Sequence, residues 1–154
     1  MEYYTEEVRQ IKEALENSWS RISSSGSDDW DKDNPAYAQC AVTALVVQDY
    51  LGGRIEWREI LVEDNSGYED YFENGDRISH YINRVDGHNM DFTRKQFPED
   101  HAVLFIPEKY HDKMEGFDNV RDYILSSEDT CSRYGYLKES VESYLEKDRV
   151  LELT

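Results

Sequence analysis

The sequence predicts a single α+β domain, in which one buried helix packs on a small antiparallel sheet between N- and C-terminal helices. Three observations predict it. Residues 34–53 carry one charge, Asp49, in a chain that is 33% charged. The residues after them are rich in β-branched and aromatic side chains and contain Asp86-Gly87, a strong hairpin signal. Apolar residues recur at helical spacing towards both ends. A chain of 154 residues has material for one core and little more.

Residues 3–22 are predicted to form the first helix, because apolar residues recur there at spacings of three and four. These residues are Tyr4, Val8, Ile11, Leu15, Trp19 and Ile22. A polar loop over 23–34 follows. Asn34 suits the N-cap and Pro35 the first position of a second helix, which we expect to end at Gly52-Gly53. Apolar residues surround this second helix, so we expect it to be buried on nearly all sides.

Four strands are expected in the middle of the chain, at 54–62, 77–85, 88–97 and 101–107. The first is expected to be irregular near Glu59, and the acidic segment 63–76 is expected to be a loop. The last third is predicted to be helical with a break at 126–130. We therefore divide the single domain, 1–154, into an N-terminal helix and loop (1–33), a core helix and sheet (34–107) and C-terminal helices (108–154).

The net charge of −17 excludes some classes of function. Binding to nucleic acid or to an anionic membrane requires clustered lysine and arginine, so we expect neither. A basic protein is a partner that suits such a charge. We expect no signal peptide and no membrane span, and two free cysteines in a reducing cytoplasm. His88, His101 and His111 lack metal-ligand spacing, and the cysteines form no CxxC pair, so neither a metal nor a cofactor is expected.

Cys40 lies near the front of the second predicted helix, where the helix dipole stabilises a thiolate and makes it a better nucleophile. A cysteine in a helix more often only packs in the core. With Asn34 as the N-cap, Cys40 would lie in the second turn, where the dipole is weaker, so a reactive role requires a partner. The other cysteine, Cys131, falls in an apolar stripe of the last helix and is predicted to be a core residue. That stripe is Cys131, Tyr134, Leu137, Val141 and Leu145.

The predicted hairpin supplies a partner for Cys40. A two-residue turn at Asp86-Gly87 would place Ile82 opposite Asp91 and His80 opposite Thr93. His80 and Asp91 then share a face of the sheet as diagonal neighbours, roughly 7–8 Å apart at the backbone. An aspartate that orients one imidazole nitrogen leaves the other to serve a thiol nucleophile. The alternative is an ordinary surface His–Asp pair. We expect the face that carries Ile82 to pack against the buried helix.

Three segments, "NPAYAQCAVTALVVQDYLGG", "SHYINRVDG" and "MDFTRKQF", resemble the bacterial YunG-like family. Its order of Cys, His and Asp on a helix and two strands is similar to that of papain-like and transglutaminase-like thiol enzymes, including the NlpC/P60 peptidases. The resemblance implies that Cys40 is the nucleophile, His80 the general base and Asp91 its orienter. It makes Gln39 and the Cys40 backbone N–H candidate oxyanion donors. Ile82, Asn83 and Arg84 are the candidate substrate-binding residues. Ala38 replaces a family glycine, and Ile82 replaces a tryptophan.

The sequence therefore predicts a papain-like thiol hydrolase or acyltransferase that acts on an amide or thioester of a small molecule or a protein. Its catalytic triad would be Cys40, His80 and Asp91. The alternative is a non-catalytic acidic binding or inhibitor module that engages a basic partner protein through the segment 63–76, where acidic and aromatic residues alternate. A third possibility is a degenerate enzyme whose triad now only stabilises the core.

Overall fold

The structure is a computed structural model, and it describes residues 5–28, 30–61, 77–96, 102–105 and 115–153. Its elements are α1 (Glu6–Glu16), α2 (Cys40–Leu51), β1 (Arg54–Leu61), β2 (Arg77–Val85), β3 (His88–Met90), the 3₁₀ turn η2 (Arg94–Gln96), β4 (Ala102–Phe105), α3 (Val120–Leu125) and α4 (Glu128–Leu153). The four strands form one antiparallel sheet in the order β3-β2-β1-β4. The predicted α+β class is therefore confirmed. The predicted acidic loop, 63–76, lies outside the described residues.

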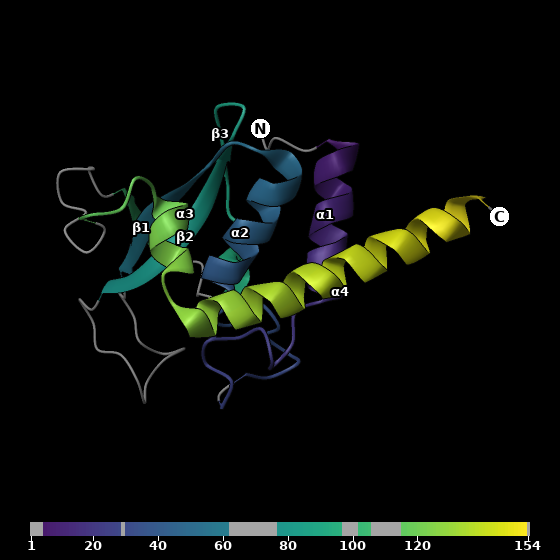
Figure 1. Cartoon of the computed structure of the whole chain (residues 1–154), viewed down its shortest axis with the longest axis horizontal. Helices are drawn as coiled ribbons and strands as arrows, with labels where there is room; N and C mark the ends of the chain where they lie inside the picture. The colour runs from purple at the N-terminus through teal and green to yellow at the C-terminus, as the bar shows by residue number, and fades with distance from the viewer. Residues whose placement is uncertain (1–4, 29, 62–76, 97–101, 106–114, 154) are drawn as a thin grey trace.

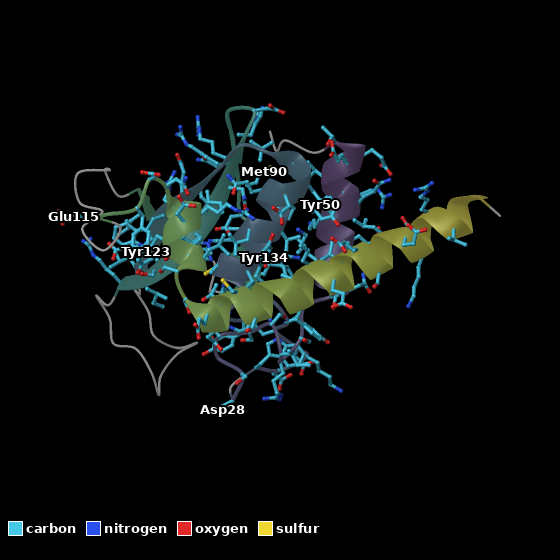
Figure 2. All side chains as sticks on the ribbon, in the orientation of Figure 1. Asp28, Tyr50, Met90, Glu115, Tyr123 and Tyr134 are labelled. Carbon is cyan, nitrogen blue, oxygen red and sulfur yellow. The ribbon has the colours of Figure 1, made fainter. Side chains whose placement is uncertain are left out.

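α2 lies at the centre of the molecule, between the sheet and the helices α1 and α4 (Figure 1). One side of α2 packs against α1 and α4, and the other packs against β1 and α3. The buried residues that make these contacts include Leu15, Val42, Leu45, Val46, Ile55, Ile124, Leu137 and Val141. Side chains such as Tyr134 of α4 fill the space beside α2 (Figure 2). The prediction of a helix buried on nearly all sides is confirmed, and each such apolar side chain contributes roughly 1.5–3 kcal/mol.

α1 is shorter than the predicted helix over 3–22, because it ends at Glu16. Beyond that end, serine side chains bond the backbone locally, as where Ser20 Oγ accepts a hydrogen bond from the Ile22 N–H. Such bonds compete with the helical hydrogen-bond ladder. Trp19 is still buried in the core, whereas Ile22 is 59% exposed. The apolar spacing therefore predicted the packing of Trp19 correctly and the length of the helix incorrectly.

The predicted end of α2 at Gly52-Gly53 is confirmed. Both glycines have positive φ, 75° and 73°, which L-residues with a side chain rarely adopt. A Cβ atom on Gly53 would lie 2.1 Å from the carbonyl oxygen of Arg84, whereas one on Gly52 would meet no atom within 4 Å. Gly53 thus allows the chain to leave α2 and pass against β2 as it enters β1.

The two-residue turn at Asp86-Gly87 is confirmed by the pairing of Val85 with His88 and of Arg84 with Asn89. The second strand, however, ends at Met90 rather than at residue 97. The predicted pairs of Ile82 with Asp91 and of His80 with Thr93 do not form, because the chain turns into η2, where the backbone bonds to itself. In that turn the Arg94 N–H donates to the Asp91 carbonyl and the Gln96 N–H to the Thr93 carbonyl.

The two faces of the sheet have different partners. α2 contacts the face that carries Tyr81 and Asn83, and the Asn83 amide donates to the Ala44 carbonyl over 3.0 Å. His80 and Ile82 lie on the opposite face, so the prediction that α2 covers Ile82 is wrong. α2 covers the face that carries Tyr81 because Val85 and Met90 also lie on that face and add buried apolar surface to it.

β1 pairs with β2 without interruption from Arg54 to Leu61, so the expected irregularity near Glu59 is not found. The predicted break in the C-terminal third separates α3 from α4. Leu137 and Val141, two residues of the apolar stripe predicted for the last helix, are buried, so the prediction is confirmed for them. Cys131 is exposed, contrary to its prediction as a core residue, because it lies in the first turn of α4, and its thiol donates to the carbonyl of the α3 residue Leu125 over 3.2 Å.

Candidate functional site

Cys40 is the first residue of α2, and Gln39 is the N-cap. The helix cannot begin at Pro35, as predicted, because Ala38 has a left-handed φ of 56°, which is incompatible with a continuous helix. The Ala38 N–H donates to Oε1 of Gln96 over 2.9 Å, which holds this turn against η2. Cys40 therefore lies in the first turn of α2, where the unpaired backbone N–H groups and the helix dipole favour an anion most strongly. Its side chain is partly exposed.

His80 is completely buried, and its Nε2 lies 2.7 Å from Oδ2 of Asp91. The Asp91 side chain is 18% exposed, so one end of the pair reaches the surface. Burial by itself lowers the pKa of His80. The hydrogen bond to Asp91 and the interaction with Cys40 outweigh burial and raise this pKa to about 9. The predicted association of His80 with Asp91 is confirmed, although the turn after β3 creates it rather than a long hairpin.

Cys40 lies beside β2, within interaction range of two consecutive residues. Its side chain contributes to the raised pKa of His80 through a hydrogen bond and through its charge. Burial raises the pKa of Tyr81, and the charge of Cys40 raises it further. Because Nε2 of His80 is bonded to Asp91, Nδ1 is the ring nitrogen that can serve the thiol. The structure thus brings the three predicted triad residues together; their catalytic roles stay predictions.

Gln39, the predicted oxyanion donor, is fully buried next to Cys40. Its amide Nε2 donates to the carbonyl of Ser20 over 2.9 Å, which uses one of the two N–H groups of that amide and fixes its orientation. The other candidate donor, the backbone N–H of Cys40, belongs to the first turn of α2 and has no helical partner. Their role towards an oxyanion stays a prediction.

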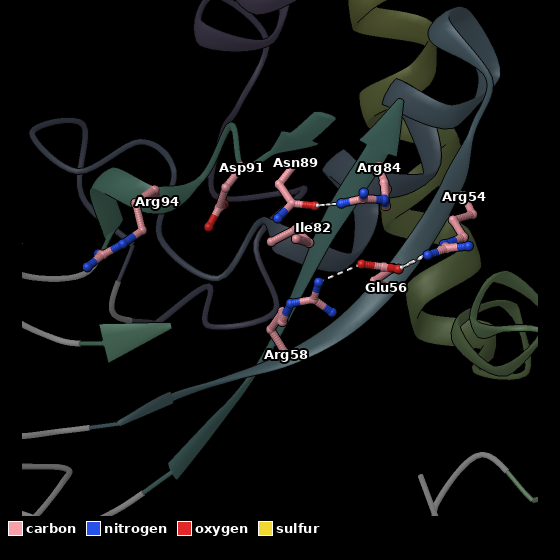
Figure 3. A pocket seen from close by; sticks show the side chains of 8 residues that line it. All are labelled: Arg54, Glu56, Arg58, Ile82, Arg84, Asn89, Asp91 and Arg94. Atoms are coloured by element: carbon pink, nitrogen blue, oxygen red, sulfur yellow. Dashed lines mark hydrogen bonds and ion pairs between the residues drawn. The ribbon is translucent and has the colours of Figure 1, made fainter. Parts of the chain in front are cut away.

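A pocket of about 670 Å³ opens on the sheet face opposite α2 (Figure 3). Two of the predicted substrate-binding residues, Ile82 and Arg84, line it, and so does Asp91. Asn83 does not, because its amide points to α2. Asp91 therefore belongs both to the pair with His80 and to the wall of the pocket.

The family model described as YunG protein matches residues 7–146. The chain belongs to the YunG family. It is also similar to the "Uncharacterized protein YunG" of Bacillus subtilis (strain 168), with 36% identity over 100 residues, which are 65% of this chain and 71% of that protein. No solved structure matches the chain.

The YunG family match spans α1 to most of α4, so it includes the three residues of the candidate site. Among the residues that the structure describes, no three His, Cys, Asp or Glu side chains form a group that could hold a metal ion. Within the same ranges, no helix has both the length and the apolar character needed to cross a membrane.

Part of the pocket of this YunG family member was not predicted from the sequence. Arg54, Glu56 and Arg58 of β1, and Arg94 of η2, line the pocket together with the predicted residues. The signal for the first three was present, because charged residues at alternate positions of a strand share one face. Arg94 could not be found in this way, because it was predicted to lie in a strand and lies in η2.

Proposed function

We propose that this protein is a thiol-dependent hydrolase or acyltransferase in which Cys40 is the nucleophile, His80 the general base and Asp91 its orienter. The observation that carries the proposal is the buried His80, bonded to Asp91 and adjacent to a cysteine at the first position of a helix. A nucleophile, a base and a group that orients the base are what thiol catalysis requires. We further propose a papain-like arrangement, because Cys40 lies on a helix, His80 on a strand and Asp91 in the turn after β3, in that order along the chain.

In the proposed reaction, the Cys40 thiolate attacks the carbonyl carbon of an amide or thioester. The electron pair of the C=O bond moves to oxygen, where the Gln39 amide and the Cys40 backbone N–H donate hydrogen bonds. The intermediate collapses to an acyl-thioester, and the leaving amine or thiol takes a proton from the His80 imidazolium. Water or another acceptor then gives a proton to His80, attacks the acyl carbon and releases the Cys40 thiolate. Asp91 holds the His80 ring in the same orientation throughout.

The compartment proposed for this chemistry is the cytoplasm, because a catalytic thiol must stay reduced and glutathione and thioredoxin maintain thiols there. Cys131, which is exposed, offers a second thiol for comparison within the same chain. It has no imidazole partner in the part of the chain that the structure describes.

The test uses a panel of small acyl thioesters and peptide amides, with acylation located by mass spectrometry. We expect an acyl adduct on Cys40, no adduct in Cys40→Ala, and normal acylation in the matched control Cys131→Ser. His80→Asn should slow acylation by about 100-fold or more, the usual contribution of a general base. Equal labelling of both cysteines in the wild-type chain, or turnover that survives Cys40→Ala, would contradict the proposal.

The acidic binding or inhibitor module stays as the alternative proposal, supported by the net charge of −17. It predicts that a basic partner protein binds equally well to the wild-type chain and to Cys40→Ala, and less well when acidic residues within 63–76 are neutralised. A partner that requires intact Cys40 would instead support the enzyme.

A further inference from the structure

The pocket on the sheet face opposite α2 has a charge opposite to that of the whole protein. Its described lining includes Arg54, Arg58, Arg84 and Arg94, against the two carboxylates Glu56 and Asp91. Four of the 17 lysines and arginines of the chain therefore line one pocket. The chain as a whole has 34 aspartates and glutamates, twice the number of its lysines and arginines. These side chains come from β1, β2 and the segment after β3, so it is the folded sheet that brings them together (Figure 3).

Glu56 organises two of these arginines. Its Oε1 lies 2.5 Å from Nη2 of Arg58, and its Oε2 lies 2.6 Å from Nη2 of Arg54. Burial raises the pKa of Glu56, but the hydrogen bonds from both arginines outweigh burial, so this pKa lies below its usual value and the carboxylate stays ionised. The three groups together carry one net positive charge.

Arg84 is the cross-strand partner of Arg54, and its Nη1 donates to Oδ1 of Asn89 over 2.7 Å. The Ile82 side chain lies between the arginines of β1 and the residues Asn89 and Asp91 (Figure 3). Guanidinium groups around an apolar floor suit the bidentate recognition of a carboxylate or a phosphate.

The pocket adjoins the candidate active site through Asp91, although neither Cys40 nor His80 lines it. Asp91 belongs to both, and Arg58 pairs with His80 in the register of β1 and β2. Arg84 lies four residues from His80 along β2, or about 13 Å at strand spacing. A molecule as long as an extended chain of a few residues could therefore place an anionic group near Arg84 and present its carbonyl to Cys40, beside His80.

We propose that this pocket binds an anionic oxygen group, a carboxylate or a phosphate, on the acyl donor. The identity of the ligand as an acyl donor rests on the proposed function, whereas the binding of the anion does not. The arginines would hold the anion at a distance from the reacting carbonyl and thereby select acidic substrates over neutral ones. The acidic surface elsewhere on the protein would disfavour their binding at other places.

The binding test uses full-length Cys40→Ala, which cannot form an acyl-enzyme, at low ionic strength. The probes are inorganic phosphate and glutarate, with neutral glutaramide as the control, and NMR shifts of β1 and β2 residues report binding. We expect saturable binding of at least one anion and none of glutaramide; which anion binds more tightly identifies the headgroup. Arg84→Gln should weaken binding about tenfold, as expected for the loss of a charge-assisted contact.

Arg77→Gln is the matched control, because Arg77 lies on the same strand, faces the other side of the sheet and does not line the pocket. It should leave binding unchanged. If Arg84→Gln does not fold, Arg54→Gln replaces it, since that side chain is 68% exposed. Absence of saturable anion binding, or equal weakening by Arg77→Gln, would overturn the proposal.

A second experiment compares, on the wild-type chain, the thioester of a succinyl-tripeptide, which is long enough to span about 13 Å, with the thioester of its neutral succinamoyl-tripeptide analogue. A higher kcat/KM for the succinyl-tripeptide thioester, reduced about tenfold by Arg84→Gln, supports the proposal. Anion binding by Cys40→Ala without acylation of the wild-type chain would leave the anion site standing and remove the proposed catalysis. Acylation with equal kcat/KM for both thioesters would leave the catalysis standing and overturn the selection of acidic substrates.

Discussion

The buried His80–Asp91 pair should make the stability of the fold depend on pH. The pKa of His80 is raised from 6.5 to about 9 in the folded protein. A raised pKa means that His80 binds its proton more tightly in the folded state than in the unfolded state. Protonation of His80 therefore stabilises the folded state. This stabilisation is fully present below pH 6.5, declines as the pH rises towards 9, and is lost above it.

The size of the effect follows from the difference between the two pKa values. Each pKa unit corresponds to about 1.36 kcal/mol, so a rise from 6.5 to about 9 corresponds to about 3 kcal/mol of unfolding free energy. Asp91→Asn preserves the size of the side chain but removes its charge. Because a hydrogen bond to a charged group contributes about 1.5–3 kcal/mol, we expect this variant to be less stable by about 2 kcal/mol at pH 6.

The assay is urea denaturation of the wild-type chain and of Asp91→Asn between pH 6 and pH 9.5. Lysines, tyrosines and the other histidines titrate in both proteins, so the difference between the two stability curves isolates the pair. We expect that difference to be largest at pH 6, to shrink between pH 6.5 and pH 9, and to be lost above pH 9. His88→Gln, a change at an exposed residue of β3, is the control and should show the wild-type dependence. A difference that stays constant across this range would refute the reasoning.

Three further changes test the geometry around the site. Cys40→Ser should lower the pKa of His80 from about 9, as followed by NMR of the imidazole ring, because the serine hydroxyl does not supply the negative charge of a thiolate; an unchanged pKa would show that the two side chains are not coupled. Ala38→Gly should raise the unfolding free energy by about 1 kcal/mol in urea denaturation, because it relieves a left-handed φ of 56°. Gly53→Ala should reduce stability far more than Gly52→Ala, for which we expect about 1 kcal/mol, because only at Gly53 would the new Cβ meet a backbone oxygen at 2.1 Å. Equal losses for the two glycines would contradict that contact.

The sequence predicted the elements whose signals are local. The hairpin at Asp86-Gly87 and the end of α2 at Gly52-Gly53 depend on residues that favour positive φ, and both are found. The burial of α2 depends on apolar residues all round the helix, which is also a local property. The end of α1 was missed because the periodicity continues past Glu16 while serine hydroxyls already bond the backbone there.

The candidate pair of His80 and Asp91 was predicted on a partly incorrect basis. The two-residue turn fixed the register up to Met90, and the shared face of the sheet was extrapolated beyond it. The chain instead turns into η2, yet the Asp91 carboxylate still reaches His80 Nε2. The extrapolation succeeded because Asp91 follows the last residue of β3 directly, so a change of backbone direction there moves its side chain by little.

The reactive setting of Cys40 could not be predicted from neighbouring residues. Asn34 and Pro35 resemble a helix start, and on that interpretation Cys40 lies one turn too deep for the dipole to act strongly. In the structure, the left-handed Ala38 delays the helix start until Cys40, and Gln96, 58 positions away, accepts the hydrogen bond from the N–H of Ala38. The same turn after β3 that ends the strand early supplies both Asp91 for His80 and Gln96 for Ala38. One departure from the predicted hairpin therefore accounts for the orientation of His80 and for the position of Cys40 at the start of α2.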